Sequence, residues 1–269
     1  MTHHILRQPL RILSIAAGVL AIGGAAILAQ QPQSAAGPRP QTPPEALPSA
    51  KELVAKHIAA IGGEAAFKAI TSVHAKGQFS LPAQGVNGDL EVLAARPSKF
   101  LLRVEIPGVG HVESGYDGKN GWSIDPMSGP TLLTGRALSE MAEDAWFDSP
   151  LHRPDRVKEM TTLARTDFDK RPAYSLKVVY NSGVEQTEYF DAETGLQLGL
   201  EGQRELPIGV LPMTTFLREY KKFGTLMQAT VLLQRTMGID QVSTLTSFEY
   251  NAVPATAFDP PPQVKALIK

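Results

Sequence analysis

The sequence of 269 residues contains no cysteine. Disulfide bonds, a thiolate nucleophile and a lipid attached to an N-terminal cysteine are therefore excluded. Stability must come from a packed hydrophobic core, which a chain of this length can form. The sequence also has little net charge, at −1, and no block of lysine and arginine. Proteins that bind the phosphate backbone need such a basic surface, so we expect no nucleic-acid partner.

Motifs that carry catalytic or metal chemistry are missing as well. The six histidines form no HExxH motif, and the sequence has no GxSxG elbow and no glycine-rich phosphate loop. His111 and His152 are weak candidates for a general base or a metal ligand. The acids between Asp117 and Asp144 could pair, but solvated side chains are the commoner outcome. We therefore predict a protein that is not an enzyme, with no catalytic residues, no metal ion and no cofactor.

One long hydrophobic run is present, close to the N-terminus. Arg7 and Arg11 precede an apolar stretch over residues 12–29, whose only polar side chain is Ser14. This pattern is typical of a secretory signal peptide, so we predict that residues 1–29 direct export. The alternative is an uncleaved membrane anchor formed by residues 12–29. Residues 30–49 contain six prolines and predict an extended linker.

The remaining chain has the pattern of a β-rich domain. Ser49 is a candidate N-cap for an amphipathic helix that ends at Gly62-Gly63, and a short second helix follows. Between residues 72 and 250, apolar and polar side chains alternate in about a dozen segments, each a predicted strand. Two hairpins, Gly115–Trp122 and Tyr189–Leu198, place aromatic residues beside an Asp/Asn/Gly turn.

Two features interrupt this alternation. The segment 127–156 contains a helical pattern over Arg136–Trp146, and Leu206–Met213 reads as an apolar turn between strands. The sequence therefore predicts a mainly β (α+β) fold: a large curled antiparallel sheet forming an unclosed barrel, with an N-terminal helical hairpin and an inserted plug or lid helix. We assign residues 50–262 to this domain and residues 263–269 to a C-terminal tail.

The order of these motifs resembles the outer membrane lipoprotein-sorting proteins, the LolA/LolB-like family. The resemblance rests on four segments: Tyr116–Trp122, Tyr189–Leu196, Tyr220–Met227 and Phe258–Pro261. It covers residues 50–262 and implies an unclosed antiparallel barrel with helices over its mouth. It also implies a periplasmic location and the binding of lipid chains, acylated proteins or other hydrophobic ligands. The family supplies no catalytic residues.

Candidate ligand-binding residues are the large apolar side chains expected to line a cavity in the sheet or the helix that covers it. They are Phe79, Leu90, Val92, Phe100, Leu102, Val104, Trp122, Leu133, Leu138, Met141, Trp146 and Phe147. The simpler interpretation is that the inserted helix fills the open side of the sheet as core, and both hold if the helix moves when a ligand enters. The resemblance also implies an arginine at the lid, for which Arg103 and Arg136 are candidates.

These observations favour a periplasmic binding or carrier protein for acyl or lipid-like ligands or for lipoproteins. Its expected partners are a hydrophobic or acylated ligand together with membrane proteins or lipoproteins, and we expect a monomer. The alternative is a sensor or adaptor, tethered to the envelope, that binds a protein partner through the sheet edge or the lid. A retained N-terminal anchor would favour that alternative, because tethering hinders a shuttle.

Overall fold

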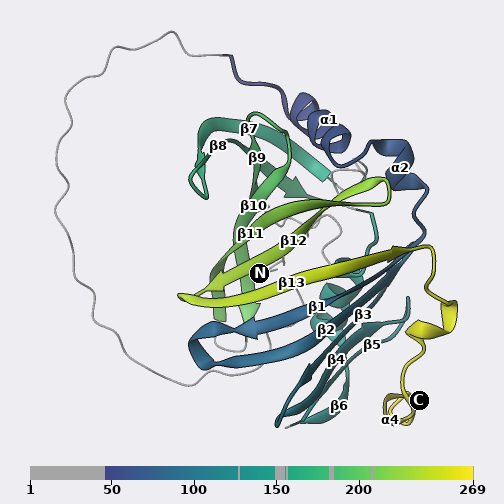
Figure 1. Cartoon of the computed structure of the whole chain (residues 1–269). Coiled ribbons are helices and arrows are strands. Elements are labelled where there is room, and N and C mark those ends of the chain that lie inside the picture. Colours follow the sequence, from purple (N-terminus) through teal and green to yellow (C-terminus); the bar gives the residue numbers. More distant parts are fainter. Residues whose placement is uncertain are drawn as a thin grey trace, which may run out of the picture.

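The structure is a computed structural model that describes residues 46–126, 128–148, 155, 157–181, 185–206 and 209–268 (Figure 1). The predicted signal peptide, most of the predicted linker and His152 lie outside these residues. Within them, no helix combines the length and the hydrophobicity needed to cross a bilayer.

The described residues form one antiparallel sheet of 13 strands. The strand order is β6-β5-β4-β3-β2-β1-β13-β12-β11-β10-β9-β8-β7. The chain therefore meanders from β1 out to one edge at β6, restarts at the other edge with β7, and returns to pair β13 with β1. The strands are β1 Ser72–Leu81, β2 Val86–Ala95, β3 Lys99–Ile106, β4 Gly110–Tyr116, β5 Gly121–Asp125, β6 Gly129–Leu132, β7 Val157–Phe168, β8 Arg171–Tyr180, β9 Glu185–Asp191, β10 Gln197–Leu206, β11 Gly209–Phe223, β12 Leu226–Thr236 and β13 Ile239–Tyr250.

Because the edge strands β6 and β7 do not pair with each other, the sheet curls without closing. Sheets of this many strands must curl or split, since the twist between neighbouring strands accumulates. The predicted fold class, a mainly β unclosed barrel, is therefore confirmed.

The N-terminal helices form the predicted hairpin, with α1 at Ala50–Ala60 and α2 at Glu64–Lys68. Ser49 caps α1: its hydroxyl accepts from the Glu52 N–H at 3.3 Å, and the Glu52 carboxylate accepts from the Ser49 N–H at 2.7 Å. The link between the helices docks on the turn between β11 and β12. A Cβ at Gly62, which has a φ of 124°, would lie 2.4 Å from the Thr225 carbonyl oxygen, so glycine is required there.

Both predicted hairpin turns are closed by an aspartate. In the first, the Asp117 carboxylate accepts from the N–H groups of Lys119 and Asn120, both at 2.7 Å. In the second, the Asp191 carboxylate accepts from the Thr194 N–H at 2.6 Å and also pairs with Arg171 at 2.7 Å. The two similar sequence motifs therefore fold by the same local chemistry, in which a short acidic side chain satisfies the turn's donors.

One face of the sheet carries the helices, and we call it the inner face. On it, Leu102 of β3 shares a cluster with residues of α2 and α3 (Gly135–Asp144), and Leu176 of β8 shares one with α1. The strand register places both leucines on the same side, because residues directly opposite each other share a face.

The outer face is covered over β2, β3 and β5 by the C-terminal segment. This segment contains a 3₁₀ turn at Ala255–Phe258 and the short helix α4 at Pro262–Lys265. Phe258 and Val264 are buried there with Leu101 and Trp122. Figure 1 shows this segment outside the curled sheet, with α4 beside β6. Residues 263–265, expected to belong to a tail, are therefore packed against the domain.

The predicted apolar turn over Leu206–Met213 is too long, because β10 ends at Leu206 and β11 begins at Gly209. β10 and β11 run through most of it and pair from Leu206 opposite Gly209 to Pro212 opposite Gln203 and beyond. Proline is tolerated in β11 because pairing with β12 begins only at Met213, so Pro212 has no neighbour on that side that needs its missing N–H.

Candidate functional site

Most of the predicted ligand-binding residues meet in one place, the apolar part of the inner face. We call this the inner apolar cluster. Its members from the predicted set are Phe79, Leu90, Val92, Phe100, Leu102, Val104, Met141 and Phe147, with Leu133 and Leu138 packed against them. Leu102 and Val92 are fully buried, and Phe100 is 2% exposed. The alternation of apolar residues along β1, β2 and β3 was the signal that identified them.

The helix α3 lies directly on this cluster, so the inserted segment fills the open side of the sheet. Met141 is 6% and Phe147 is 2% exposed. A Cβ at Gly121 would lie 3.1–3.3 Å from side-chain atoms of Leu138, Leu133 and Met141, so β5 and α3 approach closely. The predicted helix over Arg136–Trp146 is confirmed as α3, and Trp146 is half-buried just beyond its end.

Backbone hydrogen bonds attach both ends of the α3 segment to the sheet. The Leu133 N–H donates to the Gly121 carbonyl at 2.8 Å before the helix. After it, the Phe147 N–H donates to the Pro97 carbonyl at 3.0 Å. The helix is therefore held at two points, and between them Leu138 and Met141 pack on the sheet.

Arg96, at the turn between β2 and β3, joins α2 to the end of the α3 segment. Its guanidinium donates to the carbonyl of Ile70 at 2.7 Å and to that of Phe67 at 3.2 Å, and it forms an ion pair with Asp148. It also lies 4.7 Å from the ring centroid of Phe147 and 5.3 Å from that of Phe67. One side chain therefore links three segments around the inner apolar cluster.

Of the two arginines considered from the sequence, the structure excludes Arg103 and does not test Arg136. Arg103 lies on the outer face, where it cannot hold α3, because the side chains of β3 alternate and Leu102 points inward. The side chain of Arg136 lies outside what the structure describes. Sequence reasoning missed Arg96 because it lies in a turn beside Pro97, where no periodic pattern assigns a face.

Trp122 is also on the outer face, so its prediction as a cavity residue is corrected. It stands opposite Gly115 in the β4–β5 ladder, whereas Tyr116, opposite Gly121, faces inward. Trp122 is fully buried beneath the C-terminal segment. Its indole N–H donates to the Glu113 carboxylate at 2.8 Å.

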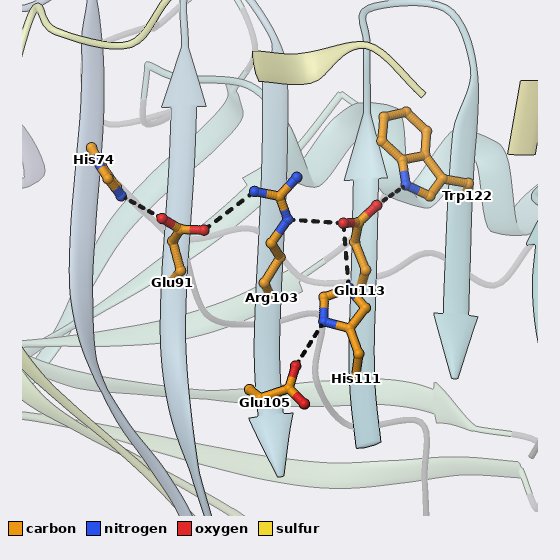
Figure 2. A network of polar contacts seen from close by, with 7 residues as sticks. All are labelled: His74, Glu91, Arg103, Glu105, His111, Glu113 and Trp122. Atoms are coloured by element: carbon orange, nitrogen blue, oxygen red, sulfur yellow. Dashed lines mark hydrogen bonds and ion pairs between the residues drawn. The ribbon is translucent and has the colours of Figure 1, made fainter. Parts of the chain in front are cut away.

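Figure 2 shows the polar network that continues from Trp122 across the outer face of β1 to β5. Arg103 donates to the second oxygen of Glu113 at 2.9 Å and to Glu91 at 3.3 Å, and Glu91 contacts the His74 ring at 2.8 Å. His111 lies 3.5 Å from Glu113 and is 39% exposed. The opposite charges of Glu91, Arg103 and Glu113 therefore alternate from β2 to β4, an arrangement that stabilises pairing between strands.

Glu91 makes this network sensitive to acid. Burial raises the pKa of the Glu91 carboxyl, but the hydrogen bonds with His74 and Arg103 outweigh burial and hold that pKa below its usual value. Because the pKa is lower in the folded state, the ionised carboxylate stabilises the fold at neutral pH. This stabilisation is lost as the pH falls through the lowered pKa.

We therefore expect Glu91→Gln to lower the free energy of unfolding at pH 7 by at most about 1 kcal/mol, since the carboxylate is 31% exposed. Between pH 7 and pH 3 this difference should shrink, because protonation of the Glu91 carboxylate removes the contribution of its contacts. Urea unfolding at both pH values measures this, with Glu105→Gln as the control, because Glu105 is 62% exposed. Parallel stability curves for Glu91→Gln and the parent would contradict the assignment.

The described residues contain no group of three or more potential metal ligands. His57 is 2% exposed, 3.2 Å from the Gly195 carbonyl oxygen, and its ring contacts Phe190 edge-on at 5.3 Å. It therefore belongs to the packing of α1 against the sheet. The inner face therefore presents apolar surface to a ligand, together with buried polar groups on β9 to β13.

No protein-family model matches the chain, and no curated protein resembles it in sequence. Solved structures do resemble it. A DUF1329 family protein from Desulfovibrio piger has a TM-score of 0.55 at 11% identity, over 78% of this chain and 96% of its own. A LolA superfamily protein from Nitrosomonas europaea has a TM-score of 0.51 at 14% identity, over 80% and 99%.

A further similar structure is a domain described as an outer membrane lipoprotein-sorting protein domain from Vibrio parahaemolyticus. It has a TM-score of 0.53 at 13% identity and covers 78% of this chain and 95% of its own. At these identities the likeness establishes a common fold. The fold expected from the order of the sequence motifs is therefore confirmed.

Proposed function

Because the chain has the LolA-like fold, we propose that it is a non-enzymatic binding or carrier protein for acyl or lipid-like ligands in the cell envelope. The observation that carries the proposal is the inner apolar cluster, a continuous apolar wall on β1 to β4 that one short helix covers. Export by residues 1–29 and a periplasmic location are part of the same proposal. The description of the similar Vibrio domain, lipoprotein sorting, is consistent with a ligand of this class.

In the proposed mechanism, an acyl chain replaces α3 on the wall. Each buried CH₂ contributes about 0.8 kcal/mol, so a long chain gains enough to compete with the helix. The contacts of Met141 and Phe147 must be given up first, and their loss offsets part of this gain. Binding would therefore be moderate and exchangeable, as a carrier requires, and weakening the attachment of α3 would strengthen it.

A second candidate function, docking of a protein partner by a sensor or adaptor, is supported by the edge strand β7. This strand has 12 residues, and within the described parts of the chain it pairs only with β8; its Leu163 is 49% exposed. Free edges of this length can accept an added strand from another chain. A pull-down that captures a partner with wild-type β7 and loses it with Leu163→Lys, while acyl probes do not bind, would favour this candidate.

A fluorescent fatty acid tests the main proposal. We expect the purified protein to bind it at one site. Leu133→Ala should raise the affinity up to about tenfold, because the substitution removes a contact that holds the α3 segment on the wall. Leu132→Ala is the matched control: it is the adjacent, equally half-buried leucine, but it packs in the outer cluster.

The measurement is a fluorescence titration of both variants and the parent, with urea unfolding to confirm that they fold. Absence of probe binding to the parent would refute the proposal. Equal changes in the two variants would refute the role given to α3.

A further inference from the structure

Polar side chains form a row across the inner face, beside the inner apolar cluster. Backbone pairing places Leu200 opposite both Glu188 and Thr215, Thr215 opposite Gln234, and Gln234 opposite Gln241. The row therefore crosses five adjacent strands, β9 to β13. All its members are buried, with exposed fractions of at most 8%. We call these five residues the polar row, although the member on β10, Leu200, is apolar.

The polar row is continuous with the apolar wall. Leu232 on β12 and Ser243 on β13 lie two residues from Gln234 and Gln241, so they share the same face. Leu232 is opposite Ser243, and Ser243 is opposite Phe79 on β1. Leu232 and Phe79 both belong to the inner apolar cluster. In Figure 1, β13 runs between β12 and β1, so the two surfaces meet within one curled wall. A molecule with an apolar tail and a polar head could contact both.

Gln234 and Gln241 have hydrogen-bonding capacity to spare. The Gln241 amide nitrogen donates to the Gln234 amide oxygen at 3.5 Å, which is the long limit for a hydrogen bond. Among the described residues, the Gln234 amide nitrogen and the Gln241 amide oxygen have no other hydrogen-bond partner. Yet these side chains are only 7% and 8% exposed. In the described part of the chain, Thr162 Oγ1 is the one polar side-chain atom that is both fully buried and without a partner, so these two amide atoms keep some access to solvent and are open to a ligand that pairs with them.

We propose that the polar row binds the uncharged, hydrogen-bonding head group of an amphiphile whose acyl chain lies on the inner apolar cluster. This inference rests on the proposed function and specifies the ligand class. Glutamine amides donate and accept, and they match a head group of hydroxyls or amides that does both. A fatty-acid carboxylate only accepts, and it would enter a row that already holds the carboxyl group of Glu188 and no lysine or arginine.

The test compares two ligands with the same acyl chain, 1-monomyristoylglycerol and myristate, by displacement of a fluorescent acyl probe. The parent protein should bind the monoacylglycerol at least about tenfold more tightly. In Gln234→Leu/Gln241→Leu, which keeps side-chain size, that preference should fall to within about twofold, with the affinity for myristate retained. Gln78→Leu is the matched control, since Gln78 lies on the outer face of β1 and bonds Asp89.

Each outcome decides between specific possibilities. If both ligands bind the parent equally, or if the preference survives in the double variant, the head-group assignment is refuted while the proposed function stands. If no acyl ligand binds the parent, both are refuted. Urea unfolding checks the double variant, and Gln241→Leu alone supplies a milder substitution whose preference should be intermediate.

Discussion

Replacing Trp122 with alanine should lower the free energy of unfolding by about 3–5 kcal/mol, among the largest single-residue effects expected in this protein. Trp122 is fully buried in the outer cluster, between the sheet and the C-terminal segment. Its ring packs on Gly115, where a Cβ would lie 2.1 Å from the indole. Alanine would leave a cavity that neither the strand ladder nor the C-terminal segment can fill without moving.

The comparison with Trp122→Phe separates packing from hydrogen bonding. Phenylalanine keeps most of the apolar volume but cannot donate to Glu113, whose side chain is 5% exposed and retains only Arg103 and His111. We expect a loss of about 1–3 kcal/mol for this variant, the cost of a missing partner for a buried acceptor. Urea unfolding of both variants measures the difference. A cost below about 1 kcal/mol for Trp122→Ala would contradict the packing described for the outer cluster.

Trp122 also shows which features of the structure could be predicted from the sequence and which could not. The hairpin that contains it was predicted correctly, because Asp117 and the following glycines determine the turn locally. The side of the sheet on which Trp122 lies could not be predicted, because the short strand β5 has too few apolar residues to show which of its faces is buried. Trp122 is buried on the outer face because Phe258 and Val264 pack over it. Both residues lie more than 130 positions after residue 122 in the chain. No local pattern carries that information.

The inner face shows the same division between local and distant causes. Strict alternation identified the apolar wall on β1, β2 and β3, and an amphipathic pattern identified α3. The polar row was not recognised. Glutamine and threonine on β11 to β13 look like solvent-facing positions until the sheet curls and buries them. Curvature is a property of the whole sheet, so the sequence of one strand cannot reveal it.

Arg96→Met should have the largest effect on ligand binding. Methionine keeps much of the aliphatic volume, but it loses the ion pair with Asp148, the hydrogen bonds to two carbonyl groups of the α2 region, and the cation–π contacts with Phe67 and Phe147. The ion pair alone is worth little, since its partners are 24% and 21% exposed. Together we expect these losses to weaken the attachment of the α3 segment by about 1.5–2 kcal/mol.

If α3 competes with the acyl chain for the apolar wall, this loss should raise the affinity for a fluorescent fatty acid by about ten- to thirtyfold. Arg103→Met is the matched control. It removes an arginine that forms ion pairs with Glu91 and Glu113, but on the outer face. It should lower the free energy of unfolding without changing the probe affinity. Equal probe affinities in the two variants, with both folded by urea titration, would show that α3 does not gate the wall. Arg96 would then contribute to the free energy of unfolding but not to the affinity for the ligand.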